Sequence, residues 1–141
     1  MSDQKPFSAI VGAALLFIAG CATTGSNAPV SFSGGVLVNA AGMTLYTFDK
    51  DPAGAGKSVC VDKCAGLWPP LFAGVDAQPG GRFSVITRDD GSRQWAYRGK
   101  PLYRWSKDQK PGDRTGDGFL NVWRVVREEA APMWTPSGAM Y

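Results

Sequence analysis

The sequence predicts a small all-β domain, and three observations support this fold class. Short apolar or alternating stretches recur between turns rich in Gly, Pro, Asn and Asp, with little helical periodicity after the first 20 residues. A hydrophobic share of 44% suits a folded chain. A ten-residue phrase also occurs twice, as GMTLYTFDKD at 42–51 and GKPLYRWSKD at 99–108. We therefore expect an antiparallel sheet, sandwich or barrel-like domain of two related hairpin units.

The first 20 residues have the features of an export signal. Lys5 precedes an apolar run over residues 7–18, which is shorter than the ~20 residues that span a bilayer. The run leads into LFIAGC at 16–21, which closely resembles the lipobox of bacterial lipoproteins. The resemblance implies cleavage after Gly20 and diacylation of Cys21. The alternative is an ordinary export signal in which Cys21 is incidental.

The next segment has the composition of a tether, since residues 22–29 are rich in Thr, Ser, Gly and Asn. Ala22 differs from the Asp that signals inner-membrane retention in enteric bacteria. We therefore expect an exported, lipid-anchored protein at the outer membrane facing the periplasm, or at the cell surface. The predicted organisation is a signal peptide at 1–20, a lipidated Cys and tether at 21–34, the β domain at 35–127 and a tail at 128–141.

The β domain is predicted to contain six or so strands. Asn39–Gly42 and the pair Asp90-Gly91 are turn signals, and each lies between two strand-like stretches. Pro101 lacks an amide hydrogen, so it should open its strand or lie on an edge. The predicted strands are 36–38, 43–48, 83–88, 93–97, 101–105 and 119–126.

The connection between the hairpin units, residues 51–81, is dense in Gly and Pro and contains CVDKC at 60–64. If Cys21 carries lipid, Cys60 and Cys64 remain as a pair, and an oxidising compartment favours a disulfide. A turn brings residues i and i+4 within the ~4.4–6.8 Å Cα separation that a disulfide requires. We expect this bond to staple the long loop. The alternative is a redox-active or copper(I)-binding pair.

The repeated phrase contains the pattern Y-x-[FWY]-x-x-D twice. Alternation along a strand places the two aromatics of each copy on one face and the preceding Leu on the other. We interpret the copies as two equivalent hairpins with aromatics in the core and aspartates at turns. The alternative is an exposed recognition platform for a sugar or quinone ring. The residues concerned are Tyr46, Phe48 and Asp51 in the first copy and Tyr103, Trp105 and Asp108 in the second.

This doubled motif resembles that of the bacterial secreted-repeat lipoproteins, a family named for it. CVDKCAGLWPPL, QWAYRGKPLY and PGDRTGDGFLNVW resemble further features of the family, and the likeness runs from about residue 35 to 126. The resemblance implies an exported, lipid-anchored repeat domain. The family has no established activity, so the resemblance transfers no catalytic residues.

Composition narrows the function classes. The chain has no histidine, which excludes Ser-His and Cys-His pairs and imidazole metal ligands. Its net charge of +3 is dispersed, which argues against nucleic-acid binding. Asp113 and Asp117 in GDRTGDG could contribute to a metal site, although the EF-hand pattern is absent and a Gly-rich connection is the alternative.

We therefore expect a binding or structural domain with no cofactor and no enzymatic activity. Its expected partners are the membrane, through the lipid anchor, and an unidentified envelope protein or glycan. Two alternatives stay open. One is an envelope redox accessory that cycles Cys60 and Cys64, and the other is a glycan or peptidoglycan binder with exposed aromatics.

Overall fold

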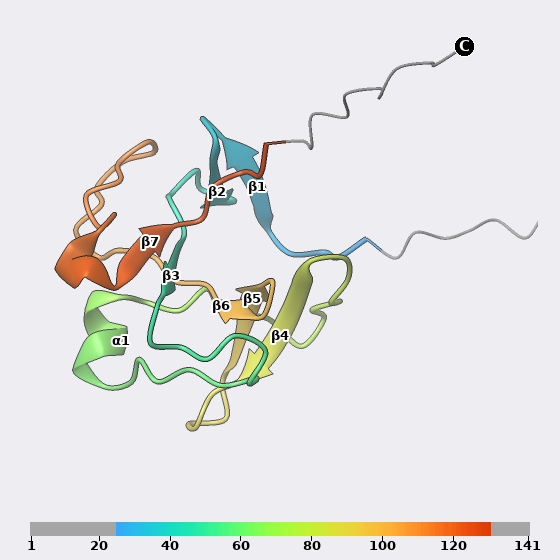
Figure 1. The fold of residues 1–141 in the computed structure, drawn as a ribbon. Helices are drawn as coiled ribbons and strands as arrows, with labels where there is room; N and C mark the ends of the chain where they lie inside the picture. The colour runs from blue at the N-terminus through green and yellow to red at the C-terminus, as the bar shows by residue number, and fades with distance from the viewer. Residues whose placement is uncertain (1–24, 131–141) are drawn as a thin grey trace, which may run out of the picture.

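Antiparallel strands build the part of the chain that the computed structural model describes, residues 25–130 (Figure 1). They form the pairs β1–β2 and β3–β7 and the three-stranded sheet β4–β5–β6, which confirms the all-β class. Within these residues, no helix has the length and apolar character needed to cross a membrane. The elements are β1 (Val30–Ser33), β2 (Val36–Asn39), β3 (Tyr46–Phe48), α1 (Lys63–Leu67), β4 (Phe83–Thr87), β5 (Arg93–Tyr97), β6 (Lys100–Pro101), the 3-10 turn η1 (Phe119–Asn121) and β7 (Trp123–Val125).

The chain folds as two equivalent units, residues 30–72 and 83–126. Each begins with a hairpin, β1–β2 or β4–β5, and continues through a glycine turn into its motif. Leu45 N–H donates to the Leu37 carbonyl at 2.9 Å, and Leu102 N–H donates to the Trp95 carbonyl at the same distance. The turn glycines, Gly42 and Gly99, both have φ of 78°, a left-handed conformation that glycine adopts without steric cost. The two-unit prediction is therefore confirmed.

Each unit sends its last strand into the other unit. β7 of the second unit pairs antiparallel with β3 of the first, where Val125 lies opposite Tyr46. The last segment of the first unit makes the matching contacts in the second, because Pro70 bridges Tyr103. The folded state of either unit therefore depends on a strand supplied by the other.

The two motif tyrosines meet at the centre of this exchange. Tyr46 N–H donates to the Tyr103 carbonyl at 2.8 Å, and Tyr103 N–H donates to the Tyr46 carbonyl at 2.9 Å. This reciprocal antiparallel bridge places an approximate two-fold axis between the two copies of the motif.

Side-chain alternation divides the interior into two clusters, as the sequence predicts. One contains the four motif aromatics together with Trp68 and Trp123. The other contains Leu45 and Leu102, whose side chains leave the opposite face of the same segments. The motif segments are thus buried on both faces.

Several boundaries differ from the sequence prediction. The predicted strand 43–48 is only β3 at its end, and the predicted strand 101–105 is only β6 at its start, because Tyr103 bridges Tyr46 and Pro70 and does not extend β6. β1 lies inside the segment 21–34 that the sequence assigns to the tether, because Val30 and Phe32 alternate with serines and pack on the Leu-containing cluster. The predicted strand 119–126 is only β7 at its end. Leu120 and Asn121 have φ of 48° and 59°, so the chain makes the turn η1 there. The predicted signal peptide, Cys21 and residues 131–141 of the predicted tail lie outside the described residues.

The equivalent glycines provide a matched stability test. An alanine Cβ at position 99 would approach the Gly54 backbone nitrogen at 2.6 Å, whereas at position 42 it would meet the Pro111 side chain at 3.2 Å. Both substitutions carry the same left-handed penalty of ~1–2 kcal/mol. Gly99→Ala should cost about 1–3 kcal/mol more than Gly42→Ala, since backbone cannot move aside as a side chain can. Urea unfolding of both variants measures this difference, and equal losses would contradict it.

Candidate functional site

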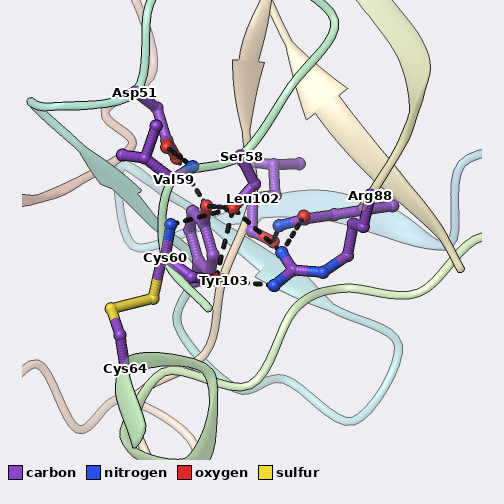
Figure 2. Close-up of a disulfide and its surroundings, with 9 residues drawn as sticks. Asp51, Ser58, Val59, Cys60, Cys64, Arg88, Leu102 and Tyr103 are labelled. Carbon is purple, nitrogen blue, oxygen red and sulfur yellow. Dashed lines mark hydrogen bonds between the residues drawn. A yellow bond between two sulfur atoms is a disulfide. The ribbon is translucent and has the colours of Figure 1, made fainter. Parts of the chain in front are cut away.

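Each motif tyrosine is hydrogen-bonded to the motif aspartate of the other copy. The Tyr46 hydroxyl donates to Asp108 Oδ2 at 2.6 Å, and the Tyr103 hydroxyl donates to Asp51 Oδ2 at 2.5 Å. None of these four side chains is more than 8% exposed. We call this arrangement the crossed Tyr–Asp pairs, and Figure 2 shows the one between Tyr103 and Asp51.

The turn after each motif aromatic explains the spacing of the motif. Asp51 N–H donates to the Phe48 carbonyl at 3.0 Å, and Asp108 N–H donates to the Trp105 carbonyl at 3.1 Å. Each aspartate thereby closes a four-residue turn that folds the chain back beside the centre of the domain. The tyrosine and the second aromatic of each motif are two residues apart and point to the same inward face. The turn then brings the aspartate, three residues further along the chain, back into the interior.

The second carboxylate oxygen of each aspartate fixes the loop that follows its own motif. Asp51 Oδ1 accepts the Val59 N–H at 2.7 Å. Asp108 Oδ1 accepts the N–H of Thr115 at 3.0 Å and its hydroxyl at 2.6 Å. Each aspartate therefore joins its own loop to the tyrosine of the other unit.

A buried arginine extends the pair at Tyr103. The guanidinium of Arg88 donates to Ser58 Oγ at 3.0 Å, to Gln94 Oε1 at 2.7 Å and to the Cys60 carbonyl at 2.6 Å (Figure 2). Ser58 Oγ lies 2.6 Å from the Tyr103 hydroxyl, which completes a continuous polar network. Sequence reasoning did not identify Arg88, because an arginine at the end of a strand ordinarily points to solvent.

Burial sets the protonation states in this network. Desolvation raises the pKa of both motif tyrosines, and the hydrogen bonds to Asp108 and Asp51 raise it further. Desolvation also raises the pKa of the Asp51 carboxyl, against the opposing effects of the Tyr103 hydroxyl, the Val59 N–H and the charges of Lys100 and Arg88. The raised pKa keeps both tyrosine hydroxyls protonated, as donors to the two carboxylates.

Cys60 and Cys64 form the predicted disulfide, with their Cα atoms 5.2 Å apart. Cys60 is fully buried; its N–H donates to Ser58 Oγ at 3.2 Å and its carbonyl accepts from Arg88. Cys64 lies in α1, so the bond joins this short helix to the buried network. The disulfide therefore fixes the residue that supplies one of the three acceptors of Arg88, the Cys60 carbonyl.

The motif aromatics lie in a stack of rings that crosses between the units. Phe48 stacks on Trp123 with centroids 4.3 Å apart, Trp123 on Trp68 at 3.8 Å, and Trp68 on Trp105 at 4.0 Å. Phe48 is 9% exposed and Trp105 5%. The alternative of an exposed recognition platform built from these residues is therefore wrong.

Asp113 and Asp117 are engaged separately. Asp113 accepts from Lys110 Nζ at 2.7 Å and from the Gln109 N–H at 2.9 Å. Asp117 accepts from Arg127 Nη2 at 3.0 Å. Across residues 25–130, no three His, Cys, Asp or Glu side chains are grouped so that they could hold a metal ion. Each aspartate forms a salt bridge with a basic side chain of the protein.

A surface depression of about 420 Å³ adjoins the disulfide loop. Its wall includes the buried Arg88, but the hydrogen bonds of that guanidinium are all made to the interior network. These acceptors, Ser58 Oγ, Gln94 Oε1 and the Cys60 carbonyl, are all uncharged. It is lined by Val61, Asp62, Ala65, Arg88, Asp89 and Asp90.

Residues 31–72 and 84–127 each match one protein family, described as a secreted repeat of unknown function. The chain belongs to this family. The two matches coincide with the two units of the fold, so each unit is one secreted repeat, and the family indicates an exported protein. No curated protein and no solved structure matches the chain significantly.

The crossed pairing in the secreted repeats can be tested by double-mutant cycles. Combining Tyr103→Phe with Asp51→Asn should give a coupling free energy of about 1 kcal/mol, because both substitutions weaken the same charge-assisted hydrogen bond. The control cycle combines Tyr103→Phe with Asp108→Asn, two positions of the same motif copy. Those effects should add to within about 0.5 kcal/mol. Coupling in the control cycle and not in the first would contradict the crossed arrangement.

The Asp51 carboxyl predicts a specific pH dependence. Its native pKa is raised above the ordinary value of 3.8, so the native state binds its proton more tightly than the unfolded chain does. The Asp51 contribution to stability therefore decreases as pH rises from about 3.8 through the native pKa. Asp51→Asn abolishes this contribution. The free energy of unfolding of the wild type minus that of the variant should be larger near pH 4 than at pH 7, measured by denaturation at each pH. A difference that grows with pH would reverse the assignment.

Proposed function

We propose that this protein is a lipid-anchored domain of the cell envelope that acts as a binding or structural module and not as an enzyme. The observation that carries the proposal is that the motif side chains point into the interior of the domain. Its tyrosines, aromatics and aspartates are buried and contact one another across the two repeats. The motif therefore builds a rigid domain and leaves its own chemistry out of reach of a substrate.

The buried groups support a non-catalytic role. The chain contains no histidine, and both motif tyrosines have a raised pKa that keeps the hydroxyl protonated. Arg88 is turned to internal acceptors. A general base next to an accessible nucleophile is the usual requirement for covalent catalysis, and the polar network supplies neither in a form open to solvent.

The segment LFIAGC at 16–21 supports the anchor. An acyl group adds ~0.8 kcal/mol of membrane affinity for each buried CH₂, and stable attachment takes more than one chain. Diacylation of Cys21 meets that condition. We place the exported domain at the outer membrane facing the periplasm, or at the cell surface.

We also propose that the Cys60–Cys64 bond is structural and does not cycle. The Cys60 main chain is held by Ser58 and Arg88, and Cys60 has no exposed surface, which supports a fixed position for this half of the bond. Thiol–disulfide exchange requires access of an attacking thiolate to sulfur, and burial opposes that access at Cys60, whereas Cys64 is partly buried.

The anchor is tested by Cys21→Ser. The wild type should sediment with membranes and its mature N-terminus should carry acyl mass, whereas the variant should be recovered in the soluble exported fraction. Cell fractionation and intact-protein mass spectrometry provide the two measurements. Retention of the variant on membranes, or an unmodified Cys21 in the wild type, would refute lipid anchoring.

A further inference from the structure

We propose that residues 72–78, which we call the anchor-side loop, form the face of the domain that rests on the lipid leaflet. This inference depends on the proposed acylation of Cys21 and adds to it a defined orientation. The occupant of the face is the bilayer that holds the acyl chains.

The first argument is where the chain leaves the domain. Asn27 is fixed to the anchor-side loop by three hydrogen bonds. Its Nδ2 donates to the Asp76 carbonyl at 2.9 Å, its Oδ1 accepts the Gln78 N–H at 2.7 Å, and its own N–H donates to the Gln78 carbonyl at 3.2 Å. The described chain therefore joins the domain at this loop, six residues after Cys21.

The second argument is the reach of that segment. Cys21 precedes Asn27 by six residues. Six residues span at most ~20 Å even when fully extended. A domain of about 100 residues has a radius of gyration of ~13 Å, so its far side is a longer distance from Asn27 than the loop is. Acylation of Cys21 thus keeps the anchor-side loop close to the leaflet.

The third argument is the chemistry of the loop. Val75 is 98% exposed and Phe72 is 59% exposed, although both are apolar. Burial of such side chains in the headgroup boundary is favourable, since it removes apolar area from water. Arg93 donates to the Gly74 carbonyl at 2.9 Å, and Asp76 supplies an opposite charge, so the loop has no strong net charge. The contact is therefore apolar and should depend little on salt.

The size of the patch favours a membrane over a protein partner. A stable protein interface buries about 800 Å² on each side, whereas two exposed side chains offer far less. A domain already held by acyl chains needs only a small contact to fix its orientation. Phe72 and Val75 suit that role and are too few to hold the protein on a membrane alone.

The experiment uses the acylated mature protein, which begins at Cys21, in phosphatidylcholine vesicles. Val75→Cys is labelled with an environment-sensitive fluorophore; with Cys21 acylated and Cys60 bonded to Cys64, the new thiol is the only free one. The matched control is Leu120→Cys, because Leu120 is 76% exposed and η1 lies across the domain from β4 and the residues before it (Figure 1). Nitroxide-labelled lipids quench any fluorophore that enters the bilayer.

We expect a blue-shifted emission and quenching at position 75 that is at least about twice that at position 120, unchanged in high salt. Equal and weak quenching at both positions, with the protein still bound and acylated, would overturn the orientation and leave the anchor intact. A blue shift at position 75 without vesicles that grows with protein concentration would assign the face to self-association and overturn the proposal. Loss of vesicle binding together with an absence of acyl mass would refute the anchor itself.

Discussion

The crossed Tyr–Asp pairs are the constraint on which the rest of the structure depends. A tyrosine hydroxyl buried without an acceptor, or a carboxylate buried without donors, would cost more than the bond itself contributes. Tyr46 and Asp51 belong to the same motif copy, yet each finds its partner in the other copy. Neither copy can therefore be satisfied until both are folded. The motif thus favours association of its two copies, and the turn that ends at each aspartate positions the carboxylate for the tyrosine of the other copy.

Strand exchange and ring stacking enforce the same mutual dependence. β7 pairs with β3 of the first repeat, and the stack alternates between repeats, since Phe48 lies on Trp123 and Trp105 on Trp68. A single repeat of about 40 residues is near the lower limit for independent folding without additional support. Here that repeat would also lack its last strand and half of its aromatic stack. Duplication within one chain supplies both at high effective concentration.

Sequence patterns that act within a few residues predict much of this fold, but they predict few of the contacts between distant segments. The alternation that separates Tyr46 from Leu45, the left-handed Gly99 and the Cys60–Cys64 bond all follow from rules that act within a few residues. The partner of Asp51 does not, because a turn motif says nothing about which distant hydroxyl will reach it. β1 lies in a polar, glycine-containing segment that is typical of a tether, so the sequence does not predict a strand there. The turn at η1 lies in an apolar run that is typical of a strand. Long-range pairing therefore explains why the partner of Asp51 was not predicted, and local composition explains the differences at β1 and η1.

The near-symmetry of the core directs attention to where the two repeats differ. After the first motif copy the chain forms the disulfide loop, α1 and the network around Arg88, whereas after the second it forms a glycine-rich turn and η1. The equivalent halves repeat the crossed Tyr–Asp pairs, so the loops that follow the motifs are where the repeats diverge. The core presents those loops in a fixed geometry, because the loop after each motif is tied to its buried aspartate, through Val59 in the first repeat and Thr115 in the second.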